Sequence, residues 1–237
     1  MNVKSYQSAL VGLLLLVVTA YGDPVYSVKT DDSPDAFVNR DAIMNNDLAN
    51  LNQATLVNLA GVAMNGVNGG ANDSTVLSDG SLAGAYQGNE GLFWGGTYLE
   101  VDFNLNDATG GCSEGYNIEQ LRVFTGWGDN RKDQWYTIDV MRIGEEAYSR
   151  LIEVDLKASG LPTGIESIVT SNNSEYVAMN VKSIKITMFP VVDPSWTQWI
   201  GSVYQEMDVV GVAAVPEPMT LSLLAIGAMG IAIRRKR

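Results

Sequence analysis

Apolar and polar residues alternate strictly in one short stretch, Leu99-Glu100-Val101-Asp102-Phe103-Asn104-Leu105, which is the clearest signal of the fold class. In an extended chain successive side chains point to opposite faces, so the apolar residues of this stretch share one face. The acidic and amide residues share the other. The stretch therefore predicts a β-strand that is buried on one side and solvated on the other.

Further segments toward the C-terminus continue this pattern. Apolar and polar residues alternate at 121–123 and 136–140, and strands are also predicted at 149–154, 176–181, 184–189 and 203–209. Turn-forming residues separate these segments, and no helical pattern lies between them. The sequence thus predicts an all-β protein, an antiparallel β-sandwich.

The region before this series is less regular. Residues 21–35 are polar with two prolines and predict a lead-in to the body. Apolar residues recur near helical spacing over 35–60, which predicts one short helix, although several asparagines weaken the pattern. Residues 61–91 are rich in Gly, Asn, Asp and Ser, which favours turns and loops around short strands.

Five short motifs follow one another in a characteristic order. They are Tyr98-Leu99-Glu100-Val101-Asp102-Phe103, Gly115-Tyr116-Asn117-Ile118, Thr125-Gly126-Trp127-Gly128-Asp129-Asn130-Arg131, Gln134-Trp135-Tyr136-Thr137-Ile138 and Tyr204-Gln205-Glu206-Met207-Asp208-Val209-Val210-Gly211. Together they resemble the discoidin-like, galactose-binding-like family. The resemblance implies a jelly-roll β-sandwich whose closing strand pairs beside the early strands, and it implies carbohydrate or cell-surface binding.

The composition excludes several classes of function. The chain has 27 Asp and Glu against 15 Lys and Arg, and such acidity repels nucleic acid, so we expect no nucleic-acid partner. Histidine is absent, which excludes Ser/His/Asp and Cys/His nucleophile arrangements and His-ligated zinc. Cys112 is the single cysteine, so no internal disulfide forms. Of the common kinds of functional site, the composition still allows carboxylate-pair chemistry and a site for a hard cation. We expect a protein that is not an enzyme.

The C-terminal residues have three parts in a fixed order. They are Val215-Pro216-Glu217-Pro218, an uncharged apolar stretch at 219–233, and Arg234-Arg235-Lys236-Arg237. The apolar stretch would form a helix of about 22 Å, which is shorter than the hydrocarbon core of roughly 30 Å, so we expect it to anchor the chain in the membrane only transiently. The terminal cations favour the cytoplasmic side. An ordinary membrane anchor is the alternative.

This tail resembles the PEP-CTERM sorting signal of Gram-negative bacteria. The resemblance implies a transmembrane sorting helix and cleavage near Pro-Glu-Pro by a membrane enzyme, an exosortase. The other terminus agrees, because Lys4 precedes an apolar run at 9–18 and signal peptidase is expected to cut after Ala20. We therefore expect export, a transient stay in the inner membrane, and delivery to the cell surface or extracellular matrix.

The predicted organisation is one domain between two targeting segments. Residues 1–20 form the signal peptide and 212–237 the PEP-CTERM sorting segment. Residues 21–97 form the N-terminal part of the body, and 98–211 form the sandwich core of the same domain.

Two sets of residues are candidates for a binding site. The first could stack on a sugar ring and bind its hydroxyls, or could equally pack and pair within the fold: Trp127, Asp129, Arg131 and Trp135. The second supplies hard oxygen ligands for a possible calcium ion, although strand alternation also explains part of it: Asp102, Asn104, Asn106 and Asp107. The loop acids Asp73 and Asp79 are a further calcium candidate.

The functional prediction is a non-catalytic module that binds or organises extracellular polysaccharide. A purely structural, self-associating surface protein is the first alternative. A polysaccharide hydrolase or lyase that uses two carboxylates is the weaker one.

Overall fold

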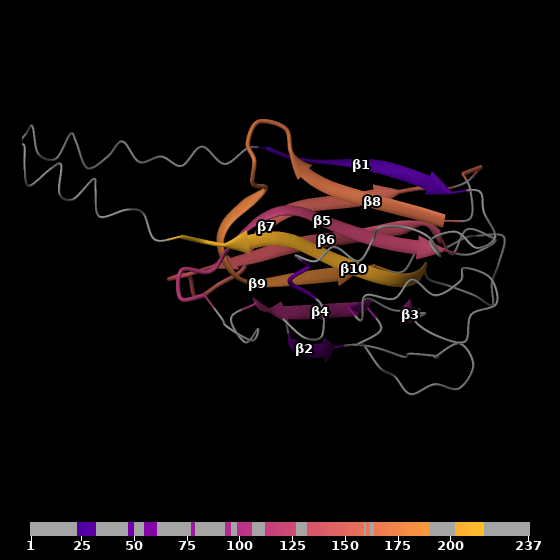
Figure 1. Ribbon diagram of the computed structural model, residues 1–237. Helices are drawn as coiled ribbons and strands as arrows, with labels where there is room; N and C mark the ends of the chain where they lie inside the picture. Colours follow the sequence, from indigo (N-terminus) through magenta and orange to yellow (C-terminus); the bar gives the residue numbers. More distant parts are fainter. Residues whose placement is uncertain are drawn as a thin grey trace, which may run out of the picture.

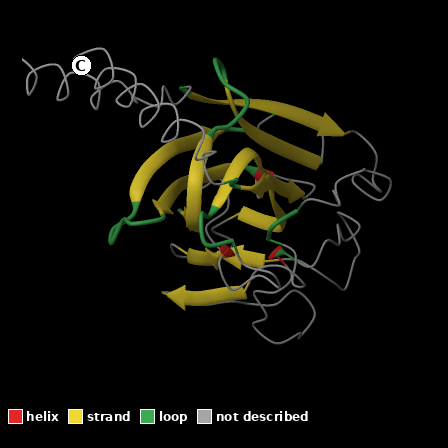
Figure 2. Ribbon diagram, turned by 60° about the vertical axis from the view of Figure 1, so that its left-hand side comes forward, coloured by secondary structure: helices red, strands yellow, loops and turns green. Residues whose placement is uncertain are grey.

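Strands make up most of the residues that the computed structural model describes, which are 23–31, 47–49, 55–60, 77–78, 93–95, 99–105, 112–126, 132–158, 160–161, 164–189 and 202–215. Every pairing between the ten described strands is antiparallel. Figure 2 shows these strands in two layers. The prediction of an all-β antiparallel sandwich is confirmed.

The first layer is built around the closing strand. Its order is β1 (Pro24–Asp31), β8 (Gly164–Ser171), β5 (Tyr116–Gly126), β10 (Ser202–Ala213) and β3 (Phe93–Gly95) (Figure 1). Strand β10 contains the closing motif of the sequence and pairs with β5 along most of its length. The closing strand therefore lies inside this layer.

The second layer contains most of the alternating stretch at residues 99–105. Its order is β7 (Ser149–Leu156), β6 (Gln134–Arg142), β9 (Ala178–Met188), β4 (Leu99–Asn104) and β2 (Thr55–Ala60) (Figure 1). Strand β5 joins the two layers, because one of its edges pairs first with β9 and then with β8. The sandwich is thus closed at this corner.

The core lies between the two layers and follows the alternation of the strands. Val123 and Met207 from the first layer, and Phe103, Ile138 and Ile186 from the second, belong to one buried cluster. In β4 the two apolar residues at 101 and 103 have no exposed surface, while the acidic neighbours Glu100 and Asp102 are partly exposed. Burial of this apolar area stabilises the fold at roughly 25 cal/mol per Å².

Four sequence predictions need correction. Residues 24–31 are strand β1 and not a lead-in, and the last part of the predicted helix over 35–60 is strand β2. The two strands predicted at 176–181 and 184–189 are one continuous strand, β9. Strand β8 was not predicted, because its apolar run is interrupted by the buried Glu166 and Ser167.

Candidate functional site

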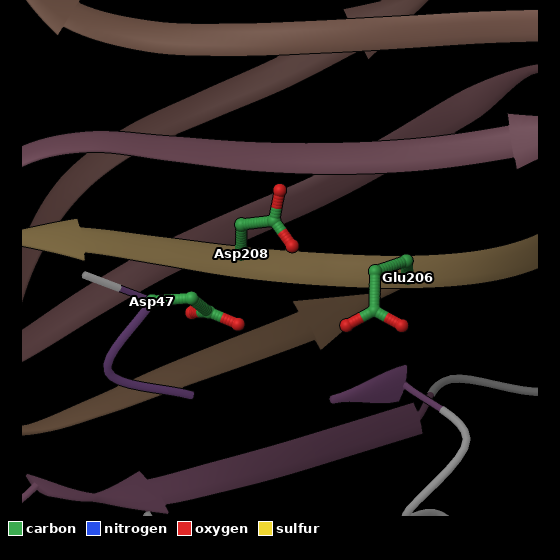
Figure 3. Close-up of side chains that lie close together, drawn as sticks. All are labelled: Asp47, Glu206 and Asp208. Carbon is green, nitrogen blue, oxygen red and sulfur yellow. The ribbon is translucent and has the colours of Figure 1, made fainter. Parts of the chain in front are cut away.

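Three buried carboxylates meet beside the closing strand. Asp47, Glu206 and Asp208 are each 1% exposed, and one oxygen of each lies within 4.8 Å of the others. Glu206 and Asp208 are two positions apart on β10, so they share a face of the strand. Asp47 comes from a separate segment that forms an isolated antiparallel bridge with Val210 (Figure 3). We call these three residues the acidic triad.

Backbone hydrogen bonds fix Asp47 in the acidic triad. Its Oδ1 accepts the Ala49 N–H at 2.9 Å and the Val209 N–H at 2.8 Å. The Leu48 N–H donates to the Val209 carbonyl oxygen at 2.7 Å, which ties the same segment to β10. Among the described residues, the buried Oδ2 of Asp47 has no hydrogen-bond partner. This oxygen is available to a ligand inside the cluster.

One guanidinium group faces two acids at this site. Arg122 of β5 donates from Nε to Glu166 Oε1 at 2.6 Å, and its Nη2 pairs with the same carboxylate. Its Nη1 lies 3.6 Å from Asp208 Oδ2, which is an ion pair without a hydrogen bond. Within the described part of the chain, both buried oxygens of Asp208 lack hydrogen-bond partners. Arg122 therefore compensates Glu166 closely and the acidic triad only in part.

Burial changes the protonation of the acidic triad. Removal from water raises the pKa of Asp47 to about 6, against the opposing effect of the Val209 and Ala49 N–H groups and of Arg122. Burial, together with the charge of Asp47, raises the pKa of Asp208 to about 8, although Arg122 opposes the shift. At neutral pH a proton or a metal cation must reduce the repulsion between these carboxylates.

The donor set fits a hard divalent cation. All the side-chain ligands of the acidic triad are carboxylate oxygens, which Ca²⁺ and Mg²⁺ prefer. The triad carries three negative charges when ionised, and Ca²⁺ takes six to eight oxygens from mono- or bidentate carboxylates and backbone carbonyls. The acidic triad could thus hold a calcium ion. Its ligands would be Asp47, Glu206 and Asp208.

The calcium set expected from sequence lies elsewhere. Asp102 and Asn104 are on β4, where Asp102 pairs in register with Lys185 of β9. Lys185 Nζ also lies 2.9 Å from Glu100 Oε1. Burial raises the pKa of Asp102, and Lys185 opposes this shift. The other candidates, Asn106, Asp107, Asp73 and Asp79, lie outside the described residues, so calcium in these sets stays a prediction.

The predicted sugar-binding set is described only at one residue. Trp135 is a half-buried residue of β6, and its ring centroid lies 4.9 Å from that of Phe189. Its Nε1 donates to Glu153 Oε1 of β7 at 3.2 Å. Trp127, Asp129 and Arg131 lie outside the described residues, so the role of this set stays a prediction.

The described body ends directly before the expected sorting signal. Ala214 is 4% exposed, whereas Val215 is 81% exposed. Residues 1–22 and 216–237, which include the predicted cut after Ala20 and most of the sorting signal, lie outside the described residues. None of the helical residues that the structure does describe forms a segment long and apolar enough to span a bilayer.

Several solved structures resemble this fold at low sequence identity. The C-terminal domain of a chitobiase from Bacteroides fragilis has 14% identity and a TM-score of 0.44, and covers 69% of this chain and 96% of its own. CBM32-3 from a family 31 glycoside hydrolase of Clostridium perfringens has 8% identity and a TM-score of 0.42, and the match covers 67% of this chain and 91% of that domain. An F5/8 type C domain from Bacteroides fragilis has 12% identity and a TM-score of 0.37, and the match covers 68% of this chain and 99% of that domain. Likenesses at this level carry no inference about ligand or activity.

The match to a known family concerns the C-terminus. No curated protein matches the chain. Residues 214–237 match the family described as the PEP-CTERM protein-sorting motif, as the order of Pro-Glu-Pro, apolar stretch and terminal cations predicted. The chain therefore ends in a PEP-CTERM sorting motif, which implies export and sorting to the cell surface by an exosortase.

Proposed function

We propose that this chain is an exported, exosortase-processed protein of the cell surface or extracellular matrix, and that its body binds or organises exopolysaccharide without catalysis. The observation that carries the proposal is the sorting motif at residues 214–237. The discoidin-like resemblance of the sequence supports the ligand class. The chain has one cysteine and so no internal disulfide. In this proposal a calcium ion held by the acidic triad stabilises the body instead.

The surface around Trp135 supports the sugar-binding part of the proposal. Trp135 of β6 and Phe189, the residue directly after β9, form an apolar platform. Thr187 of β9 is two positions before Phe189 and so shares its face, and it is partly exposed, whereas its partner Thr137 on β6 is 2% exposed. The Glu153 carboxylate lies beside the indole nitrogen. An apolar platform with a few polar groups is the arrangement that binds sugar rings.

Replacing Trp135 tests this surface. Trp135→Ala is expected to weaken binding to the host's exopolysaccharide about tenfold or more, because it removes the larger ring of the platform. Trp135→Phe keeps an aromatic face and is expected to retain most of the affinity. Binding of the processed proteins is measured by affinity electrophoresis, with melting temperatures as the control for folding. Equal affinity of Trp135→Ala and the parent, or no binding by the parent with and without calcium, would count against the proposal.

A polysaccharide hydrolase or lyase is the weaker alternative. The carboxylates of the acidic triad lie close together, but their 1% exposure puts them out of reach of a polymer chain. An enzyme of this kind would reduce the polymer's mass during incubation with the processed protein.

Self-association is a second candidate function, because β1 exposes apolar side chains at the edge of its layer. Val25 and Tyr26 are 40% exposed and Val28 is 36% exposed. Among the described strands, β1 pairs only with β8. An exposed apolar edge strand favours strand pairing between two molecules. Such pairing would suit a structural component of the matrix.

A charged substitution in β1 tests self-association. The processed parent is expected to form dimers or larger species as its concentration rises, and Val28→Lys is expected to stay monomeric. Ile143→Lys is the control, because Ile143 is 37% exposed but lies in the turn after β6. Sedimentation velocity measures all three proteins. A parent that stays monomeric at every concentration would exclude this function.

A further inference from the structure

Both ends of the described body lie at the same end of the sandwich. Pro24, at the start of β1, pairs with Ser171, while Ala213, at the end of β10, pairs with Tyr116. Because β1, β8, β5 and β10 are successively antiparallel, these two positions fall on one side, the left of Figure 1. We call this side the terminal face. It consists of residues 23, 112–115, 143–148, 172–177 and 214.

Hydrogen bonds hold the chain firmly at both exit points of the terminal face. The Asn172 N–H donates to the Asp23 carbonyl oxygen at 3.2 Å, and the Ala214 N–H donates to the Gly115 carbonyl oxygen at 2.9 Å. Cys112 Sγ also donates to the Ala214 carbonyl oxygen at 3.3 Å. The body is therefore folded up to the residue before Val215.

No spacer separates the folded body from the sorting motif. Pro216 is two residues after Ala214, and two extended residues span about 7 Å. A folded enzyme domain of even 100 residues has a radius of gyration of about 13 Å. An enzyme that acts near Pro216 must therefore lie against the terminal face while it holds its substrate.

The terminal face carries a surplus of negative charge. Asp23, Glu114, Glu146 and Glu175 are exposed on it. Of the cations described there, Arg142 pairs with Glu145 at 3.6 Å, and Lys182 Nζ donates to the Glu145 carbonyl oxygen at 2.5 Å. The residues of the terminal face include five acids and no Lys or Arg, so Arg142 and Lys182 beside it leave the charge negative. Such a face is repelled by anionic lipid and attracted by a cationic protein surface.

We propose that the terminal face docks against a cationic surface of the membrane-bound sorting enzyme, with Glu114, Glu146 and Glu175 as the charged contacts. The folded body is then part of what the enzyme recognises, in addition to the Pro-Glu-Pro sequence. This inference rests on the proposed function, because it requires that the sorting motif be processed.

Charge reversal in the full-length chain tests the docking surface in the native host. Glu146→Lys is expected to slow C-terminal processing about threefold, and Glu146→Lys/Glu175→Lys about tenfold, because rim charges chiefly change the rate of encounter. Asp155→Lys is the matched control, since Asp155 is an exposed residue of β7 toward the opposite end of the sandwich. Pulse-chase labelling measures the loss of the precursor. Processing of Glu146→Lys/Glu175→Lys at the parental rate, or equal slowing by Asp155→Lys, would overturn the proposal.

A spacer provides the second arm of the test. Ten Gly and Ser residues inserted between Ala214 and Val215 separate the two by about 17 Å on average. With this spacer, the charge-reversed and parental chains are expected to be processed at equal rates. A charge-reversed chain that stays slow with the spacer would overturn the docking surface and point to a folding defect. Absence of C-terminal processing in the parent would instead contradict the proposed function itself.

Discussion

Arg122→Met is expected to lower the free energy of unfolding by about 3 to 5 kcal/mol, the usual effect of removing one partner of a buried ion pair. Glu166, 1% exposed, would lose the guanidinium that binds it through Nε and Nη2. Asp208 would lose the Arg122 charge, which opposes its raised pKa. Urea unfolding of the processed protein measures the effect.

Arg150→Met is the matched control for this substitution. Arg150 Nε lies 2.6 Å from Asp139 Oδ1, but its side chain is 51% exposed. An exposed pair contributes at most about 1 kcal/mol, so the control is expected to change stability little. Equal losses of unfolding free energy in the two variants would mean that the buried pair of Arg122 stabilises the fold no more than the exposed pair of Arg150.

Calcium is expected to raise the melting temperature of the processed, chelator-treated protein by about 5 to 10 °C at pH 7.5. The estimate takes an ion concentration about 100 times the dissociation constant, which stabilises by about 2.7 kcal/mol. Differential scanning calorimetry measures the shift. Asp208→Asn and Asp47→Asn are expected to abolish it, because each removes a carboxylate of the acidic triad.

Asp102→Asn distinguishes the two calcium candidates. It changes the set predicted from sequence on β4 and leaves the acidic triad intact, so the calcium shift is expected to persist. Loss of the shift in Asp102→Asn, with its retention in Asp208→Asn, would place the ion on β4. If calcium does not raise the melting temperature of the parent protein, neither set of residues binds calcium.

The same groups predict how stability depends on pH without calcium. Folding raises the pKa of Asp208 from 3.8 to about 8 and that of Asp47 from 3.8 to about 6. Between these values the folded state binds more protons than the unfolded state, so the triad's contribution favours folding at low pH and is lost as the pH rises. Calcium requires the ionised carboxylates, so its stabilising effect increases over the same range.

The sequence predicted those parts of the fold in which alternation is regular. The strict alternation of residues 99–105 appears as β4, with Val101 and Phe103 in the core. It failed where buried polar groups break the pattern, as in β8, where Glu166 is stabilised by Arg122 from another strand. Local spacing holds no information about such a partner.

The candidate metal site was only half visible in the sequence. Glu206 and Asp208 lie two positions apart in the closing motif, which was a usable signal. Asp47 lies in a segment that was predicted as helical, and its hydrogen-bond partner Val209 is 162 residues away. Only the paired β-sheet brings these residues together.

The intact mass of the protein recovered from the surface of its host tests the central claim of export and sorting. The account predicts a chain that begins at Tyr21 and ends within Val215 to Pro218, together with any group that processing attaches. The full-length polypeptide, found in the inner membrane with Arg237 still present and no processed form outside, would contradict it.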